Sequence, residues 1–131
     1  MKVTKHFSVE EFMCRDGTPY PDAWVEGRLV PLCQSLEVLR ALFKSPITIL
    51  SGYRTDAYNA RIGGARNSQH LKGRAADIKV KGVDPAQVAA AIEAAIARGD
   101  MLPGGLGRYP TFCHYDIRGV NARWTGRRVT S

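Results

Sequence analysis

The sequence is poor in the residues that define several protein classes. Of its 131 residues, three are cysteine and three are histidine. The cysteines Cys14, Cys33 and Cys113 are scattered and form no Cys-x-x-Cys pair, which argues against a disulfide framework and against a thiolate zinc knuckle. We therefore expect all three to be buried as small apolar side chains in a reducing compartment.

Long apolar stretches are also missing. No run approaches the roughly 20 apolar residues that cross a bilayer, so the sequence predicts no membrane insertion. The opening residues MKVTKHF carry charge but no apolar core of signal-peptide length. We expect synthesis in the cytoplasm without a signal peptide, so action on a cell wall or in a periplasm would need a separate export route.

The composition is that of one folded domain with an excess of positive charge. Hydrophobic residues make up 44% and charged residues 24%, and the net charge is +7. This length and composition predict a single domain over residues 1–131. The charge favours an anionic partner such as nucleic acid, a membrane surface or a cell wall. Because the basic residues are dispersed and do not follow one helix, we expect no specific nucleic-acid partner.

Periodicity predicts an α+β fold. Two helices are expected, from about Gly27 to Lys44 and from the cap Asp84 to Gly99, after a short capped helical segment over Ser8–Met13. Strands are expected at 47–50, 75–80, 106–109, 112–117 and 123–129, and residues 51–74 are a long loop or a series of short turns. The predicted architecture is a small, mainly antiparallel sheet packed against helices.

Two of the three histidines lie in motifs that also contain aspartate. In SQHLKGRAAD at residues 68–77, a glycine-bearing turn separates His70 from Asp77. In TFCHYDIR at residues 111–118, His114 and Asp116 alternate on one face of a strand. Each pair taken alone fits either a structural hydrogen bond or part of a metal site.

Together the motifs offer the ligands of a catalytic metal centre. His70, Asp77 and His114 are residue types that bind zinc, and three protein ligands leave a fourth position for water. Asp116 is then placed to accept a proton from that water or to orient a ligand. The string SGYRT at residues 51–55 adds Arg54, which is either a surface arginine or a group that binds a carboxylate or carbonyl oxygen.

Several motifs, in this order, match one known family. They are SGYR at 51–54, Asn59, GGA at 63–65, Ser-x-His-x-x-Gly-x-Ala-x-Asp at 68–77, and Gly105-x-Gly107-x-Tyr109 followed by Phe112-x-His114-x-Asp116. On these residues the chain resembles the zinc D-Ala-D-Ala carboxypeptidase-like peptidases of family M15, in the subgroup that ends in His-x-Asp. The resemblance extends from FSVEEF at 7–12 to the region of Arg123 and Trp124.

The resemblance implies a set of roles. His70, Asp77 and His114 would hold Zn²⁺ on the face of the sheet, and Arg54 would hold a substrate carboxylate or polarise the scissile carbonyl. Two further substrate-binding residues are expected at the start of these motifs, Tyr53 and Ser68. Relatives commonly place the general base two or three residues before the last zinc ligand.

That base is missing here, because the corresponding positions are Thr111 and Phe112. One interpretation makes His114 the ligand and Asp116 the base or an orienting carboxylate. The other makes Asp116 the third metal ligand and His114 the base. We take the first as the prediction, with Asp116 and Arg54 as the catalytic residues.

The function that these expectations favour is a zinc-dependent peptidase that hydrolyses amide bonds in peptidoglycan stem or cross-link peptides. A phage or prophage endolysin is one biological role for such an enzyme, since phage lysis enzymes often leave the cytoplasm through a separately encoded pore. The alternative is a non-catalytic, zinc-containing module that binds the cell wall or forms part of a virion. We expect a monomer.

Overall fold

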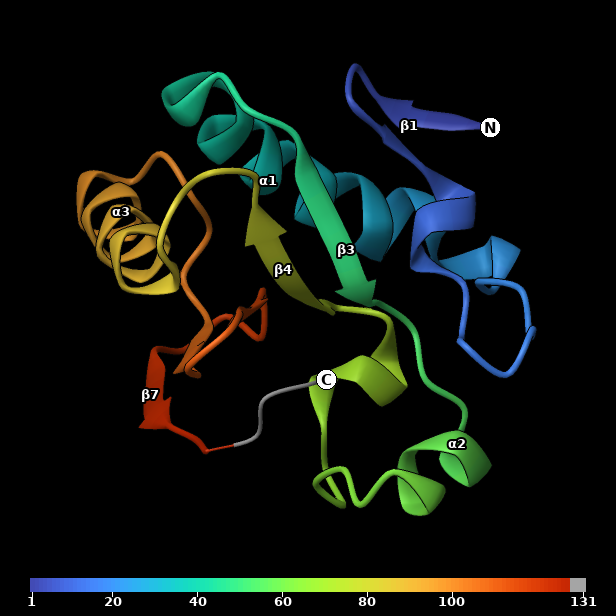
Figure 1. Cartoon of the computed structure of the whole chain (residues 1–131). Coiled ribbons are helices and arrows are strands. Elements are labelled where there is room, and N and C mark those ends of the chain that lie inside the picture. Colours follow the sequence, from blue (N-terminus) through green and yellow to red (C-terminus); the bar gives the residue numbers. More distant parts are fainter. Residues whose placement is uncertain (128–131) are drawn as a thin grey trace.

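A five-stranded sheet forms the centre of the computed structural model, which describes residues 1–127 (Figure 1). Its strand order is β3-β4-β6-β5-β7. The strands are β3 (Ile47–Ser51), β4 (Ala75–Val80), β6 (Cys113–Asp116), β5 (Gly105–Arg108) and β7 (Ala122–Thr125). The β3–β4, β4–β6 and β5–β6 pairs are antiparallel, whereas β5 and β7 are parallel. The prediction of a mainly antiparallel sheet is therefore confirmed.

Two long helices, α1 (Val30–Phe43) and α3 (Pro85–Arg98), pack against each other and against one face of the sheet (Figure 1). The alternation of each strand decides which residues face them. In β4 the core contains Ala76, Ile78 and Val80, and in β6 it contains Cys113 and Tyr115. The intervening residues, including the predicted site residues of both strands, therefore point to the opposite face.

Helix α1 follows a short π-helical turn, η3 (Val25–Leu29). Because Pro31 has no backbone N–H, the carbonyl of Gly27 lacks the partner that a regular α-helix would supply. The helix predicted from Gly27 therefore has its first turn widened. It ends as expected near Lys44, whose φ of 51° gives a left-handed cap before Pro46.

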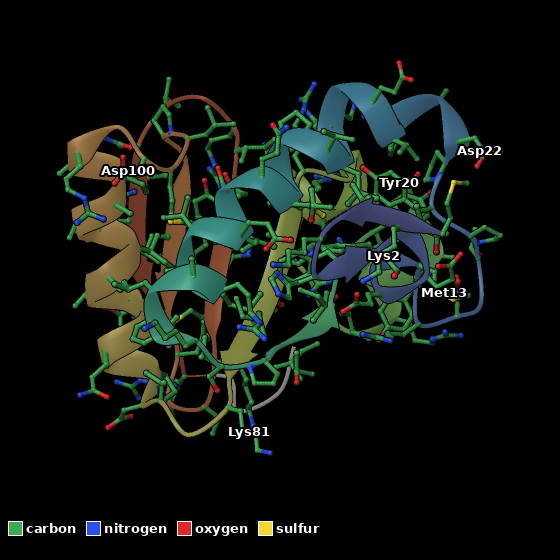
Figure 2. The ribbon with its side chains drawn as sticks, turned by 90° about the horizontal axis from the view of Figure 1, so that it is seen from above. Lys2, Met13, Tyr20, Asp22, Lys81 and Asp100 are labelled. Carbon is green, nitrogen blue, oxygen red and sulfur yellow. The ribbon has the colours of Figure 1, made fainter. Side chains whose placement is uncertain are left out.

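The N-terminal segment contains a hairpin that periodicity did not predict. Strands β1 (Lys2–Thr4) and β2 (Phe7–Ser8) pair before the 3-10 turn η1 (Val9–Phe12). The backbone N–H of Ser8 donates to Glu11 Oε1 over 2.8 Å, as the predicted cap requires. This end lies far from the end of α3, as the positions of Lys2 and Asp100 in Figure 2 show. A further 3-10 turn, η2 (Asp22–Trp24), leads into η3.

The segment predicted as a loop or short turns contains a helix, α2 (Asp56–Arg61), and a 3-10 turn, η4 (Gln69–Lys72). The Thr55 hydroxyl caps α2 by accepting from the N–H of Tyr58 over 3.2 Å. At six residues, α2 is too short to show an apolar stripe, which is why periodicity missed it.

Two further expectations concern the cysteines and the last strand. All three cysteines are buried and free, and no helix within residues 1–127 is long and apolar enough to cross a membrane. Of the edge strand predicted at 123–129, the structure has β7 ending at Thr125, and residues 128–131 lie outside the described part of the chain.

Two leucines of α1 differ in burial, and we expect their alanine variants to differ in stability. Leu36 of α1 is fully buried, whereas Leu42 is 53% exposed. We expect Leu36→Ala to lower the free energy of unfolding by about 2–5 kcal/mol, because it leaves a cavity in the core. We expect Leu42→Ala to change it by less than about 0.5 kcal/mol. Urea unfolding of both variants measures the difference, and equal losses would contradict the packing described here.

Candidate metal centre

One row of residues crosses all five strands on the face opposite the helices. Reading across the sheet, the register aligns Ser51, Asp77, His114, Gly107 and Trp124. Directly opposed residues in antiparallel strands have Cβ atoms about 4.5–5.5 Å apart, so the pairing alone brings Asp77 and His114 together. Gly107 leaves a gap in the row, and the Trp124 ring reaches across it to lie 4.9 Å from the His114 ring.

His70 reaches this row from η4. The Ser68 hydroxyl caps the turn by accepting from the His70 N–H over 3.1 Å, and Gly73 ends it at a φ of 68°. The His70 carbonyl also accepts from the Arg54 N–H over 3.0 Å, which ties the turn to the segment after β3. The side chain of His70 is therefore buried beside the sheet, although its own element is not part of it.

Three side chains converge on a volume that fits a metal ion. His70 Nε2 and His114 Nδ1 both lie 3.1 Å from Asp77 Oδ1. One ligand atom from each residue lies within 4.8 Å of the others. Ligands of tetrahedral zinc at 2.0–2.1 Å from the ion are about 3.3 Å apart, so small shifts would accommodate the ion. Two imidazoles and one carboxylate are also a donor set that zinc accepts.

The other nitrogen of each histidine already has an acceptor. His70 Nδ1 lies 2.7 Å from the Gly52 carbonyl, and His114 Nε2 lies 2.7 Å from Asp116 Oδ2. Metal-binding histidines almost always donate their second N–H to such a carbonyl or carboxylate, which fixes the ring and the tautomer. The arrangement therefore presents His70 Nε2 and His114 Nδ1 as the two ligand nitrogens.

Arg54 lies directly behind Asp77. Its Nη2 is 3.1 Å from Asp77 Oδ2, its Nε donates to Ser51 Oγ over 3.0 Å, and its Nη1 donates to Asn59 Oδ1 over 3.2 Å. Asn59 in turn donates to the Ala65 carbonyl over 2.9 Å. The guanidinium is only 3% exposed, so its charge acts mainly on the buried carboxylate beside it.

Asp116 is completely buried and bound on several sides. Oδ1 accepts from the Gly105 N–H over 2.8 Å and from Arg118 Nε over 2.9 Å. Oδ2 accepts from Arg118 Nη2 over 2.8 Å and lies against His114. The close approach to β5 is possible because Gly105 has no side chain: a Cβ there would overlap the carboxylate.

These contacts change the pKa values of the site. Burial would raise the pKa of Asp77, but the charges and hydrogen bonds of His70 and His114 outweigh it and hold that pKa far below its usual range. Burial lowers the pKa of His70. It would also lower that of His114, but hydrogen bonds to Asp116 and Asp77 raise the pKa instead. The carboxylates are thus ionised at neutral pH and attract a cation to the space between the rings.

The triad lines a cleft of about 480 Å³. Of the residues predicted to bind substrate, Arg54 and Ser68 line this cleft. The Tyr53 ring instead packs edge-on against Tyr20 and Trp24, with ring centroids 6.0 and 5.7 Å away. Tyr53 therefore belongs to an aromatic cluster with Tyr20 and Trp24 and is not among the residues that line the cleft.

The rest of the cleft comes from residues that the motifs did not single out for chemistry. An aromatic wall is formed by Tyr109 and Phe112, which stack with centroids 4.4 Å apart, and by Trp124, whose Nε1 donates to the Tyr109 hydroxyl over 2.9 Å. Arg66 and Arg118 add positive charge. Arg118 stands two residues after Asp116 in the sequence, and this proximity could have indicated that Arg118 belongs to the site.

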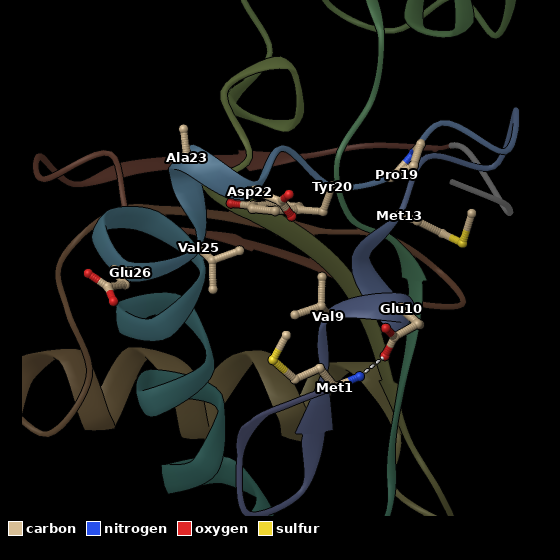
Figure 3. Close-up of a pocket in the computed structure, with 10 residues that line it drawn as sticks. All are labelled: Met1, Val9, Glu10, Met13, Pro19, Tyr20, Asp22, Ala23, Val25 and Glu26. Atoms are coloured by element: carbon tan, nitrogen blue, oxygen red, sulfur yellow. Dashed lines mark hydrogen bonds and ion pairs between the residues drawn. The ribbon is translucent and has the colours of Figure 1, made fainter.

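A second hollow is lined by residues of the N-terminal segment and of the turns η2 and η3 (Figure 3). It is larger, about 780 Å³, and its lining combines apolar side chains such as Val9 and Val25 with the carboxylates of Glu10, Asp22 and Glu26. The metal-ligating cluster lies in the smaller cleft. Donor chemistry, rather than size, therefore selects the candidate site.

Comparison with known proteins agrees with this geometry. A family model described as Peptidase M15 matches residues 5–116, which include the whole triad. This chain belongs to the peptidase M15 family. The match spans the motifs from SGYR to His-x-Asp, and in this M15 chain Arg54, Ser68 and the triad from those motifs line one cleft.

Two curated relatives are similar to the chain. One is a probable peptidoglycan L,D-endopeptidase MepK of Haemophilus influenzae, 35% identical over 123 residues, which cover 88% of this chain and 62% of the relative. The other is a zinc D-Ala-D-Ala carboxypeptidase of Streptomyces albus G, 38% identical over 50 residues, which cover 38% of this chain and 20% of the relative. The M15 chain thus spans less than two thirds of either relative.

The geometry predicts the outcome of a metal-binding test in which a histidine outside the cleft is the control. We expect the chain to bind one Zn²⁺ tightly. His114→Ala and Asp77→Ala should weaken binding by more than the roughly 10–100-fold that follows loss of an outer partner, because each removes a ligand. His6→Ala is the matched control, since His6 pairs with Glu37 away from the cleft. Competition with a chromogenic chelator measures the affinities, and a loss in His6→Ala equal to that in His114→Ala would refute the site.

Proposed function

We propose that this chain is a zinc-dependent peptidase that hydrolyses amide bonds in the stem or cross-link peptides of peptidoglycan. The observation that carries the proposal is the His70, Asp77 and His114 triad at the floor of an open cleft, with the outer nitrogen of each imidazole already held. Both relatives support the substrate class, since one is named as a peptidoglycan endopeptidase and the other as a D-Ala-D-Ala carboxypeptidase.

The chain's own residues account for binding, orientation and charge. When bound, zinc supplies Lewis acidity that activates a water and polarises an amide carbonyl. Asp77 is held in position by Arg54, whose positive charge lies 3.1 Å from the carboxylate and stabilises negative charge that develops nearby. The aromatic wall of Tyr109, Phe112 and Trp124 offers an apolar surface for the substrate.

For Asp116 we propose the orienting role and not that of general base. Both of its oxygens accept hydrogen bonds from Gly105 or Arg118, and Oδ2 also holds the outer nitrogen of His114. A general base must reach the proton that it removes, and Asp116 has no exposed surface. The carboxylate thus fixes the tautomer in which His114 Nδ1 faces the metal position.

The first test is hydrolysis itself. Purified protein with Zn²⁺ should release new amino groups from peptidoglycan, and His70→Ala should abolish the release, while His6→Ala should retain it. Mass spectrometry of the released muropeptides identifies the bond and separates carboxypeptidase from endopeptidase action. Unchanged release by a folded His70→Ala variant would rule out the proposed metal centre.

A second test separates the two roles of Asp116. If it orients His114, Asp116→Asn should weaken zinc binding by about 10–100-fold, and much of the activity should return at saturating zinc. If it is the base, activity should fall by about 10²–10⁴-fold at any zinc concentration, and the acidic limb of the pH–rate profile should disappear. Zinc titrations of activity at several pH values decide between these outcomes.

The second candidate function is a non-catalytic, zinc-containing module that binds the wall. One observation favours it: among the described residues that line the cleft, Asp77 is the only carboxylate. No second acid is therefore at hand for proton transfer. A turbidity assay on cells with permeabilised outer membranes distinguishes the candidates, because binding without cleavage leaves the suspension turbid.

The proposal extends to a role in phage or prophage lysis. The motivation is electrostatic, since a net charge of +7 favours encounter with an anionic wall polymer. Release of the protein through a separately supplied membrane pore, followed by lysis of the host cells, would support that role.

A further inference from the structure

The cleft contains three arginines in very different surroundings. Arg54 is 3% exposed, and each of its side-chain nitrogens contacts a protein oxygen. Arg66 is exposed on the turn before η4. Arg118 lies between these extremes, because its side chain is 28% exposed and one edge of its guanidinium is fixed.

The fixed edge of Arg118 is the one that carries Nε. Nε and Nη2 donate to the two oxygens of Asp116 over 2.9 and 2.8 Å. The guanidinium carbon also lies 5.4 Å from the centre of the Trp124 ring, which supports the group from its face. The side chain is thus held in one orientation before any ligand arrives.

A guanidinium has a second edge that can bind a carboxylate in two-pronged fashion. That edge consists of Nη1 and the remaining N–H of Nη2, and it is not the edge that Asp116 occupies. Because Arg118 lines the cleft and is partly exposed, this edge is accessible from the side where a substrate would lie. Since the orientation is already fixed, little side-chain entropy is lost on binding.

The charge of the surroundings favours an anion. Arg54, Arg66 and Arg118 outnumber the carboxylates of Asp77 and Asp116 by one, and a bound divalent cation would add to that excess. Asp116 also divides its charge between Arg118 and His114. The negative charge of Asp116 therefore does not fully compensate the positive charge of Arg118, and the arginine still attracts a second carboxylate.

We propose that Arg118 binds a free carboxylate of the substrate and so makes the enzyme selective for wall peptides that carry one beside the scissile bond. The inference rests on the proposed function and names the group that its site recognises. In a stem peptide such a carboxylate comes from the C-terminal residue, from the side chain of diaminopimelate or from the α-carboxylate of γ-linked D-glutamate. Amidation removes the charge from each of these sources.

The test uses L-Ala-γ-D-Glu-meso-diaminopimelate-D-Ala-D-Ala in four forms: unmodified, amidated at the C-terminus, amidated at the diaminopimelate side chain, and amidated at the α-carboxylate of D-Glu. With the zinc-loaded full chain, one of the amidations should lower kcat/KM by about 10–100-fold, mainly through KM. The form that is affected identifies the source of the carboxylate. In Arg118→Gln the same amidation should change kcat/KM by less than about threefold.

The control separates recognition from support of the metal centre. Arg118→Gln also loosens Asp116 and His114, but that loss affects all four peptides equally and shows in the zinc affinity, whereas the ratio between peptides reports recognition alone. Arg66→Gln removes the same charge from the same cleft and should keep the ratio. Equal rates on all four peptides, or a ratio that survives in Arg118→Gln, would overturn the proposal.

A failure of the proposed function gives a different result. If no peptide is cleaved, calorimetry on the same zinc-loaded chain measures the four dissociation constants. Selective binding that is lost in Arg118→Gln would then support the carboxylate site in a protein without peptidase activity. Cleavage of all peptides at equal rates would support the proposed peptidase function and refute the carboxylate site on Arg118.

Discussion

The carboxylate of Asp77 is the group on which the rest of the site depends. It is buried on β4, an inner strand of the five-stranded sheet, where an isolated charge would be strongly disfavoured. Arg54, His70 and His114 surround it at 3.1 Å and compensate that charge. Removing any of them would leave a buried charge with too few partners, which destabilises more than the pair itself stabilises. The same convergence of groups creates the volume in which a divalent cation fits.

Each of the three side chains around this carboxylate is itself held by a hydrogen bond to another residue. Ser51 and Asn59 hold Arg54, the Gly52 carbonyl holds His70, and Asp116 holds His114. Outer partners of this kind set the orientation and basicity of metal ligands. The metal-ligating side chains are therefore held in fixed positions, whereas Tyr109, Phe112, Trp124 and Arg118 line the rest of the cleft.

Two glycines on β5 allow groups of the site to approach this strand closely. Gly107 leaves space for the Trp124 ring to lie against His114, and Gly105 lets its N–H approach the Asp116 carboxylate. A larger residue at either position would push a side chain out of the cleft wall or away from the metal ligand. The parallel pairing of β5 with β7 is what brings Trp124 to this row, and strand periodicity contained no sign of it.

The sequence by itself determined the ligand types, the long helices and the alternation that puts His114 and Asp116 on one face, because these depend on residue chemistry and on spacing along a single element. The motifs also predicted the set of His70, Asp77 and His114, but only the tertiary structure decided how these groups come together. The β4–β6 register opposes Asp77 to His114, which are 37 residues apart, and η4 brings in His70 from outside the sheet. It also placed Tyr53 in an aromatic cluster and Arg118 in the cleft. The physical reason is that side-chain direction follows from local backbone geometry, whereas proximity between distant segments follows from strand register and packing, which no local pattern encodes.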